Sequence, residues 1–157
     1  MPVHAGLHLA LPPEFTIDQT MVSFRAPPPT VGDPRVMQKQ TPIRPSLIVH
    51  RRDVGDVALE ILAGEITAEL VQSVGGLSGL TTEAFSYDDG DLGIIISFDF
   101  AVPEVMTARQ YHVVRKDGPI LTTLTLTVDK LTLTDTAKTR WLAFFAAVAR
   151  DGTGALA

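Results

Sequence analysis

The stretch RQYHVVRKDGPILTTLTLTV, residues 109–128, decides the fold of this chain. It predicts two strands joined by a tight turn, because the pair Asp117-Gly118 tolerates the positive φ that hairpin turns require. In the second strand Leu124 and Leu126 alternate with threonines, which is typical of a half-buried strand. The stretch contains no evident nucleophile, general base or metal cage. We therefore expect function to come from the surface of a sheet rather than from chemistry.

Composition limits the class of protein. A chain of 157 residues with 45% hydrophobic and 20% charged residues fits one globular domain that can bury its own core. The formal net charge of −5 argues against nucleic acid as a partner, because clustered Lys and Arg normally supply that affinity. The absence of cysteine excludes disulfides, Cys-ligated zinc and a lipidated cysteine. No stretch reaches the ~18 apolar residues of a membrane span, and the start lacks the basic and apolar regions of a signal peptide. We expect a soluble cytoplasmic protein that does not insert into a membrane.

Alternating and helical patterns cover most of the chain. Strands are predicted at 7–11, 20–25, 46–52, 80–87, 92–100 and in the two arms of 109–128. Amphipathic helices are predicted from about 59 to 74, where Gly64 is internal, and from Thr134 or Asp135 to Gly152. The chain is expected to form a single domain, 1–157, with a proline-rich insertion loop at 26–45 and a flexible tail at 152–157.

This element order predicts an α+β sandwich, a mostly antiparallel sheet with two main amphipathic helices that cover one face. The second face then requires an explanation. An uncovered face is normally polar, yet several apolar residues and a row of threonines cannot all belong to a core packed against helices. The residues expected on an exposed, half-apolar surface are Val22, Phe24, Ile48, Ile95 and Tyr111, with hydroxyl groups from Ser97, Thr123 and Thr125.

Two patterns resemble metal sites. His4 and His8 have the spacing that binds zinc on a helix, but a strand at this position does not bring the two rings together. Asp88, Asp89 and Asp91 resemble a calcium loop, but they lack the spacing and the closing glutamate of an EF-hand. A strand and a solvated turn account for them, and no metal site is expected.

Two further patterns resemble catalytic or anion sites. Ser78 lies in a glycine-rich run, but the strand that follows it does not fit a nucleophile elbow. His50, Arg51 and Arg52 fit a solvated strand end, and His112 fits a packed histidine within a strand. Because no base is linked to a nucleophile, we expect no enzymatic activity and no cofactor.

The patterned segments resemble a known family. The segments are GLHLALPPEFTIDQTMVSF, SLIVHRR, the amphipathic helix, QYHVV, ILTTLTLTV and TRWLAFFAAV. Together, over roughly residues 7–150, they resemble the DcrB-like and Eag-type proteins, which implies a PsbP-like α/β/α sandwich. The missing cysteine departs from the lipoprotein branch, and the 26–45 insertion is longer than expected for the family.

The resemblance to the Eag-type proteins also implies a function. Proteins of that type are cytoplasmic homodimers in bacterial type VI secretion, and they shield the hydrophobic N-terminal helices of PAAR-type effectors until the effector is loaded on the spike. The expected client contacts are Val22, Phe24, Ile48, Ile95, Ser97, Tyr111, Thr123 and Thr125. The alternative is a non-enzymatic domain of the same fold that binds a small ligand between sheet and helices.

Overall fold

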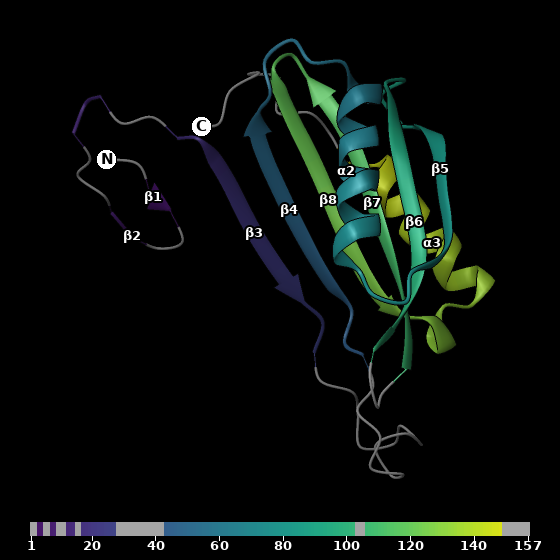
Figure 1. Ribbon diagram of the computed structural model, residues 1–157. Coiled ribbons are helices and arrows are strands. Elements are labelled where there is room, and N and C mark those ends of the chain that lie inside the picture. Colours follow the sequence, from purple (N-terminus) through teal and green to yellow (C-terminus); the bar gives the residue numbers. More distant parts are fainter. Residues whose placement is uncertain are drawn as a thin grey trace.

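A six-stranded antiparallel sheet dominates the computed structural model, which describes residues 3–4, 7–8, 12–14, 17–27, 43–102 and 106–148. The strand order is β3-β4-β8-β7-β6-β5 (Figure 1). The strands are β3 Gln19–Arg25, β4 Ser46–Asp53, β5 Ser78–Ser86, β6 Leu92–Val102, β7 Met106–Asp117 and β8 Ile120–Asp129. The helices are α2 Leu59–Ser73, the 3-10 turn η1 Lys130–Thr132 and α3 Asp135–Ala146. A separate ribbon pairs β1 Val3–His4 with β2 Leu7–His8.

Most predicted elements lie where the sequence patterns indicated. The strands at 20–25 and 46–52, the 109–128 hairpin and the first helix are confirmed. Thr134 caps α3 by accepting a hydrogen bond from the Ala137 backbone N–H at 3.1 Å. However, α3 ends at Ala146, before the predicted stop at Gly152, which lies outside the described residues. Only Leu7 and His8 of the predicted 7–11 strand are described, as β2. No helix in the described ranges is long and apolar enough to cross a bilayer.

The predicted arrangement of helices over the sheet is wrong. Instead of covering one face together, α2 and α3 lie on opposite faces, each over part of the sheet (Figure 1). Six antiparallel strands with one helix on each face form a more sheet-dominated structure than the expected PsbP-like α/β/α sandwich. The prediction failed because apolar residues on both faces of β6 and β7 give each helix a separate surface to cover.

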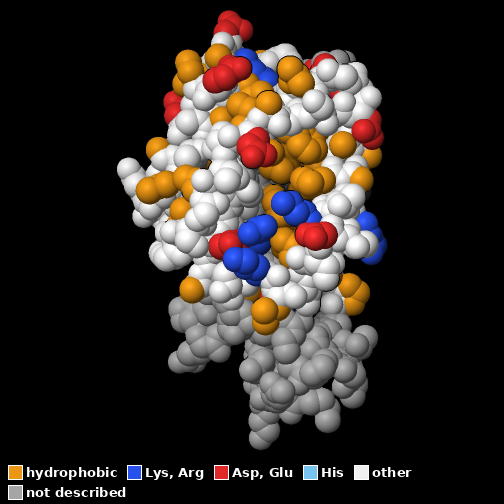
Figure 2. Space-filling view, turned by 90° about the vertical axis from the view of Figure 1, so that its right-hand side faces the viewer, with side chains coloured by type: hydrophobic (Ala, Val, Ile, Leu, Met, Phe, Trp, Pro, Cys, Tyr) orange, Lys and Arg blue, Asp and Glu red, His pale blue; other side chains and the backbone are white. Residues whose placement is uncertain are grey.

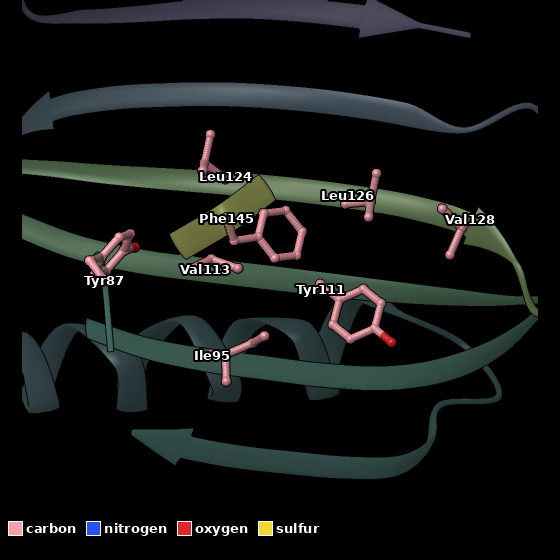
Figure 3. Close-up of a cluster of buried hydrophobic side chains, with 8 residues drawn as sticks. All are labelled: Tyr87, Ile95, Tyr111, Val113, Leu124, Leu126, Val128 and Phe145. Atoms are coloured by element: carbon pink, nitrogen blue, oxygen red, sulfur yellow. The ribbon is translucent and has the colours of Figure 1, made fainter. Parts of the chain in front are cut away.

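The larger core lies under α3. Phe145 from this helix is fully buried, and its ring lies 6.1 Å from that of Tyr111. Figure 3 shows Phe145 in the middle of side chains contributed by β6, β7 and β8. The cluster comprises Tyr87, Ile95, Tyr111, Val113, Leu124, Leu126, Val128 and Phe145. Because all of the strand residues in this cluster share one face, alternation along the strands produces the core directly.

The smaller core lies under α2. Leu62 and Ala63 from the helix pack on Ile96, Val114 and Leu121 from three neighbouring strands. These three strand residues alternate in sequence with residues of the other core, as the pleat requires. The central strands are therefore buried on both faces.

The outer strands β3 and β4 lie beyond both helices in Figure 1. Met21 is 63% exposed, and Val22 and Phe24 on the opposite face of β3 are 51% and 56% exposed. Large apolar residues exposed on both faces of an edge strand are unusual, because such strands normally carry charge or are covered. β3 therefore has no cover from the described part of the chain, whereas β4 beside it is partly buried.

The proline-rich loop is closed at its base. The Ala26 backbone N–H donates to the Pro45 carbonyl at 2.8 Å, and Arg44 donates through Nε and Nη2 to the Ala26 carbonyl at 2.9 and 2.6 Å. The predicted insertion at 26–45 thus connects the two strands of the β3–β4 hairpin. Its residues 28–42, like the predicted tail at 152–157, lie outside the described residues.

Two glycines have clear roles. Gly118, in the predicted turn of the β7–β8 hairpin, has a φ of 58°, a conformation that favours glycine. At Gly93 a Cβ atom would lie 2.5 Å from the Val114 carbonyl oxygen and 2.7 Å from Cε2 of Tyr87. Gly93 therefore allows the Tyr87 ring to pack directly on the backbone of β6.

Candidate functional site

An apolar groove of about 560 Å³ runs beside α3 over the uncovered part of the sheet, and we call it the α3 groove. Its floor comes from β3, β4, β8 and the end of β7, and its wall comes from α3 and the residues after it. The lining residues are Phe24, Leu47, Val49, Arg51, Arg115, Asp117, Thr122, Leu124, Phe144 and Val148. The volume lies within the ~300–1,000 Å³ range of ligand sites.

The strand register produces the floor of the groove. Side chains at paired positions of antiparallel strands lie side by side on one face. On the α3 face, β3, β4 and β8 contribute the rows Phe24-Leu47-Leu126, Val22-Val49-Leu124 and Thr20-Arg51-Thr122. The floor therefore has two apolar rows and one polar row, and the polar row lies toward the β7–β8 turn.

The helical wall of the groove exposes an aromatic ring. Phe144 is 44% exposed, whereas the adjacent Phe145 is fully buried. The Phe144 ring contacts its neighbours on the helix, at 6.0 Å from the Trp141 ring and 5.8 Å from the Phe145 ring. With Phe24 on the opposite side, the groove has an exposed aromatic residue on each bank.

Arg115 fixes the polar end of the groove. Its guanidinium donates to the Val148 carbonyl at 2.9 Å and to the carboxylates of Asp89 and Asp91 at 2.8 and 2.9 Å. It also lies 4.0 Å from the centre of the Tyr87 ring. Burial alone would lower the pKa of Arg115, but the two carboxylates outweigh burial and the net shift is upward. Arg115 thus connects the end of α3 to the sheet and holds the wall in place.

The groove has a mostly apolar lining with a few polar groups. Its polar lining groups are the guanidinium groups of Arg51 and Arg115, the carboxylate of Asp117 and the hydroxyl of Thr122. Arg51 Nε donates to the Thr122 hydroxyl at 3.3 Å. The remaining lining is apolar, and burial of apolar area stabilises a complex by roughly 25 cal/mol per Å² before the costs of association.

Two of the eight predicted contact residues lie together at this site. Phe24 lines the α3 groove, and Val22 lies beside it on the same face of β3. Ile95, Ser97 and Tyr111 share the α3 face but line a hollow on the β5 side of the helix, where Ile95 and Tyr111 are buried in the core.

The other three predicted residues lie on the α2 face. Ile48, Thr123 and Thr125 line a hollow of about 480 Å³ beside α2. His112 is buried at the same place, and its Nε2 and Nδ1 atoms lie 2.7 Å from Gln110 Oε1 and 3.1 Å from the Thr125 hydroxyl. Burial lowers the pKa of His112 to about 4. The eight residues therefore do not form one surface.

The prediction missed most of the groove. Leu47 and Val49 lie in the strand predicted at 46–52, Leu124 lies in the predicted hairpin, and Phe144 and Val148 lie in the last predicted helix, but none of the five was among the predicted contact residues. The available signal was the 46–52 strand, in which Leu47 and Val49 alternate with Ile48. Pairing that strand with 20–25 in a hairpin would have placed Phe24 beside Leu47.

The resemblances to metal and anion sites have structural explanations. Asp88 and Asp89 lie in an exposed turn between β5 and β6, as predicted, and Asp89 and Asp91 also form ion pairs with Arg115. His50 Nε2 lies 2.8 Å from Gln19 Oε1, and burial followed by the charge of Arg52 lowers the pKa of His50. The described residues contain no group of three or more His, Cys, Asp or Glu side chains that could hold a metal ion.

Comparison with known proteins supports the fold alone. No protein-family model and no curated protein matches the sequence. The structure is similar to the crystal structure of PA94, a protein of unknown function from Pseudomonas aeruginosa that is described as a candidate regulator. The TM-score is 0.64 at 16% sequence identity, and the match covers 90% of each chain.

Proposed function

We propose that this protein is a cytoplasmic, non-enzymatic chaperone or adaptor of bacterial type VI secretion. In this proposal it binds and shields the hydrophobic N-terminal transmembrane segments of a PAAR-type effector, and it helps to load the effector on the secretion spike. The observation that carries the proposal is the open apolar groove beside α3, with Phe24 and Phe144 exposed on its two banks.

The physical reason is the shape and polarity of the groove. An apolar helix in water requires cover for its side chains, and a hydrophobic groove accepts such a helix through anchors spaced along one helical face. The two apolar rows of the floor offer contact area to the bound helix. The polar row that contains Arg51 and Thr122 makes one end of the groove polar and the other apolar, which favours one orientation of the bound segment. The polar end would lie next to the end of the apolar segment, where a chain leaves its hydrophobic run.

We also propose a homodimer formed at the edge strand β3. The exposure of Met21 and Phe24 supports this part of the proposal, because apolar residues on an edge strand are normally covered. A two-fold axis perpendicular to the sheet would place both α3 grooves on the same face, which doubles the area offered to a client. Light scattering on the purified chain and on Met21→Lys tests this part, because a cation at the edge should shift a dimer toward monomer.

The binding test uses an apolar helical peptide of about 20 residues that carries an environment-sensitive fluorophore. The Phe24→Asp and Phe144→Asp variants should each weaken binding by roughly tenfold or more, as expected for central contacts. Leu131→Asp is the matched control, because Leu131 is 74% exposed on η1 and outside the groove. Equal binding by all three variants would contradict the assignment of the groove.

A second test addresses the client itself. The chain is co-expressed with the apolar N-terminal fragment of a PAAR-type effector, and the yield of soluble fragment is measured. The wild-type chain should raise that yield, and Phe24→Asp should abolish most of the gain. Binding of the model peptide without any effect on the effector fragment would retain a helix-binding groove but reject the role in secretion.

A further inference from the structure

A second hollow lies on the β5 side of α3, separated from the α3 groove by the helix, and we call it the β5–α3 hollow. Its volume is about 350 Å³. The floor comes from β5, β6 and β7, and the wall comes from Lys138 and Leu142 of α3. Figure 2 views the molecule from this side and shows hydrophobic side chains between Lys or Arg and Asp or Glu side chains.

The register places a row of hydroxyl groups across this floor. Thr81 pairs with Ser97, and Ser97 pairs with Tyr111. The Thr81 and Ser97 hydroxyl oxygens lie 2.8 Å apart. Tyr111 is only 3% exposed, and its buried hydroxyl has no well-formed hydrogen bond among the described residues, although it interacts with the neighbouring Arg109 side chain. Arg109 and Tyr111 both line the hollow, so the row of hydroxyl groups ends beside a cation.

Charged groups adjoin this row on one side. The Asp99 carboxylate accepts from Arg109 Nε at 2.8 Å and from Lys130 Nζ at 2.7 Å. One carboxylate thus faces two cations. Lys138 adds a third cation on the wall, and Glu83 is the acidic residue of the lining. The hydrogen bond from Arg109 is the main cause of the lowered pKa of Asp99, so the pair is ionised at neutral pH. The positive surplus favours an anionic ligand group.

Apolar groups adjoin the row on its other side. Glu83 pairs with Ile95, and the hollow continues over Ile95 to Phe85 and Leu142. The hollow therefore changes from cationic, through hydroxyl-lined, to a mostly apolar end that has Glu83 at its edge. A ligand that matches this order carries an anionic head and a short hydrophobic tail.

We propose that the β5–α3 hollow binds a small amphipathic monocarboxylate. The carboxylate lies toward Arg109 and Lys138, within reach of the Tyr111 hydroxyl, and the hydrocarbon tail lies on Ile95, Phe85 and Leu142. The site is independent of the α3 groove and does not require that the chain bind an apolar helix. It adds a small-molecule ligand to a protein whose proposed function concerns a protein client.

The test is an NMR titration of the isotope-labelled full chain with hexanoate, and hexanamide is the neutral probe of the same length. Hexanoate should shift amide signals of β5, β6 and the start of α3, and it should bind at least several-fold more tightly than hexanamide. Equal affinity of the two probes, or shifts confined to residues of the α3 groove, would overturn the proposal.

Three variants make the test specific. Lys138→Ala should weaken hexanoate binding several-fold, whereas Arg140→Ala on the same helix, outside this lining, should leave it unchanged. Tyr111→Phe should weaken hexanoate binding while the melting temperature stays nearly level, because the variant removes a buried hydroxyl that has no well-formed hydrogen bond. A Tyr111→Phe variant that lowers the melting temperature without affecting hexanoate binding would show that the hydroxyl has a structural role and would overturn its role in binding. Equal hexanoate binding by Lys138→Ala and Arg140→Ala would overturn the role of Lys138.

Discussion

The two halves of the sheet have the same alternating strand pattern but differ in cover. In the half centred on β6, β7 and β8, α2 and α3 cover opposite faces and the central side chains are buried. In the other half, β4 is only partly buried and no helix covers β3, where Val22 and Phe24 remain about half exposed. Alternation of apolar residues therefore predicts a strand, whereas the burial of that strand depends on where the helices pack.

Two adjacent phenylalanines on α3 give the largest expected difference in stability, because Phe145 packs in the covered core and Phe144 faces the open groove. Phe145→Ala should lower the free energy of unfolding by about 3–5 kcal/mol, because it opens a cavity in the α3 core. Phe144→Ala should lower it by under about 1 kcal/mol, because this side chain is 44% exposed in the groove. Urea unfolding followed by circular dichroism measures both. Equal losses would mean that the groove wall is part of the core.

Two histidines, one on β7 and one on β4, are expected to differ in how much they make the free energy of unfolding depend on pH. Burial lowers the pKa of His112 in the folded chain to about 4, from an ordinary value of 6.5. As pH falls below about 6.5, the unfolded chain therefore takes up a proton before the folded chain does, and stability should decrease by up to about 3 kcal/mol by pH 4. Measurement of the free energy of unfolding between pH 7 and pH 4, in wild type and His112→Gln, tests this expectation.

His50 provides the control for that experiment. Its pKa is also lowered, first by burial and then by Arg52, but it lies in the open half of the sheet and is bound to Gln19. His50→Gln should therefore keep most of the pH dependence of the wild type, whereas His112→Gln should lose most of it. The opposite result would place the main titrating histidine on β4.

Two glycines give expected effects of opposite sign. Gly93→Ala should destabilise the chain by about 1–3 kcal/mol, because the new Cβ atom would overlap the Val114 carbonyl and the Tyr87 ring. Gly64→Ala should stabilise it by up to about 1 kcal/mol, since the position is helical and nothing lies within 4 Å. Thermal melts of both variants measure these changes in stability. A stable Gly93→Ala variant would show that the Tyr87 packing can relax.

The sequence predicted the local elements much better than their packing. The hairpin at 109–128, the cap at Thr134 and the helix around Gly64 follow from turn chemistry, capping and periodicity, which are local properties. Alternation also identified β3 and β4. Each of these signals needs only a few neighbouring residues, so one sequence was sufficient to locate them.

The candidate site was predicted only in part, because it depends on pairing between strands. Alternation does not determine which face a helix covers, so Phe24, Ile48 and Ile95 were grouped together although Ile48 lies on the opposite face. Phe144 and Phe145 both fit the apolar stripe of α3, yet the structure buries one and exposes the other. A shift of one position moves a residue between core and surface, and that choice is made by tertiary contacts.

The backbone hydrogen bond between Ala26 and Pro45 has a practical consequence for engineering. Because it brings the two ends of the β3–β4 connection together, the segment between them should be replaceable by a tag, a reporter domain or new chain termini. Loop-closure entropy changes only slowly with length, and the strand register is already set below this point. A fluorescent protein inserted there would report on events at the neighbouring groove without altering the residues that form it.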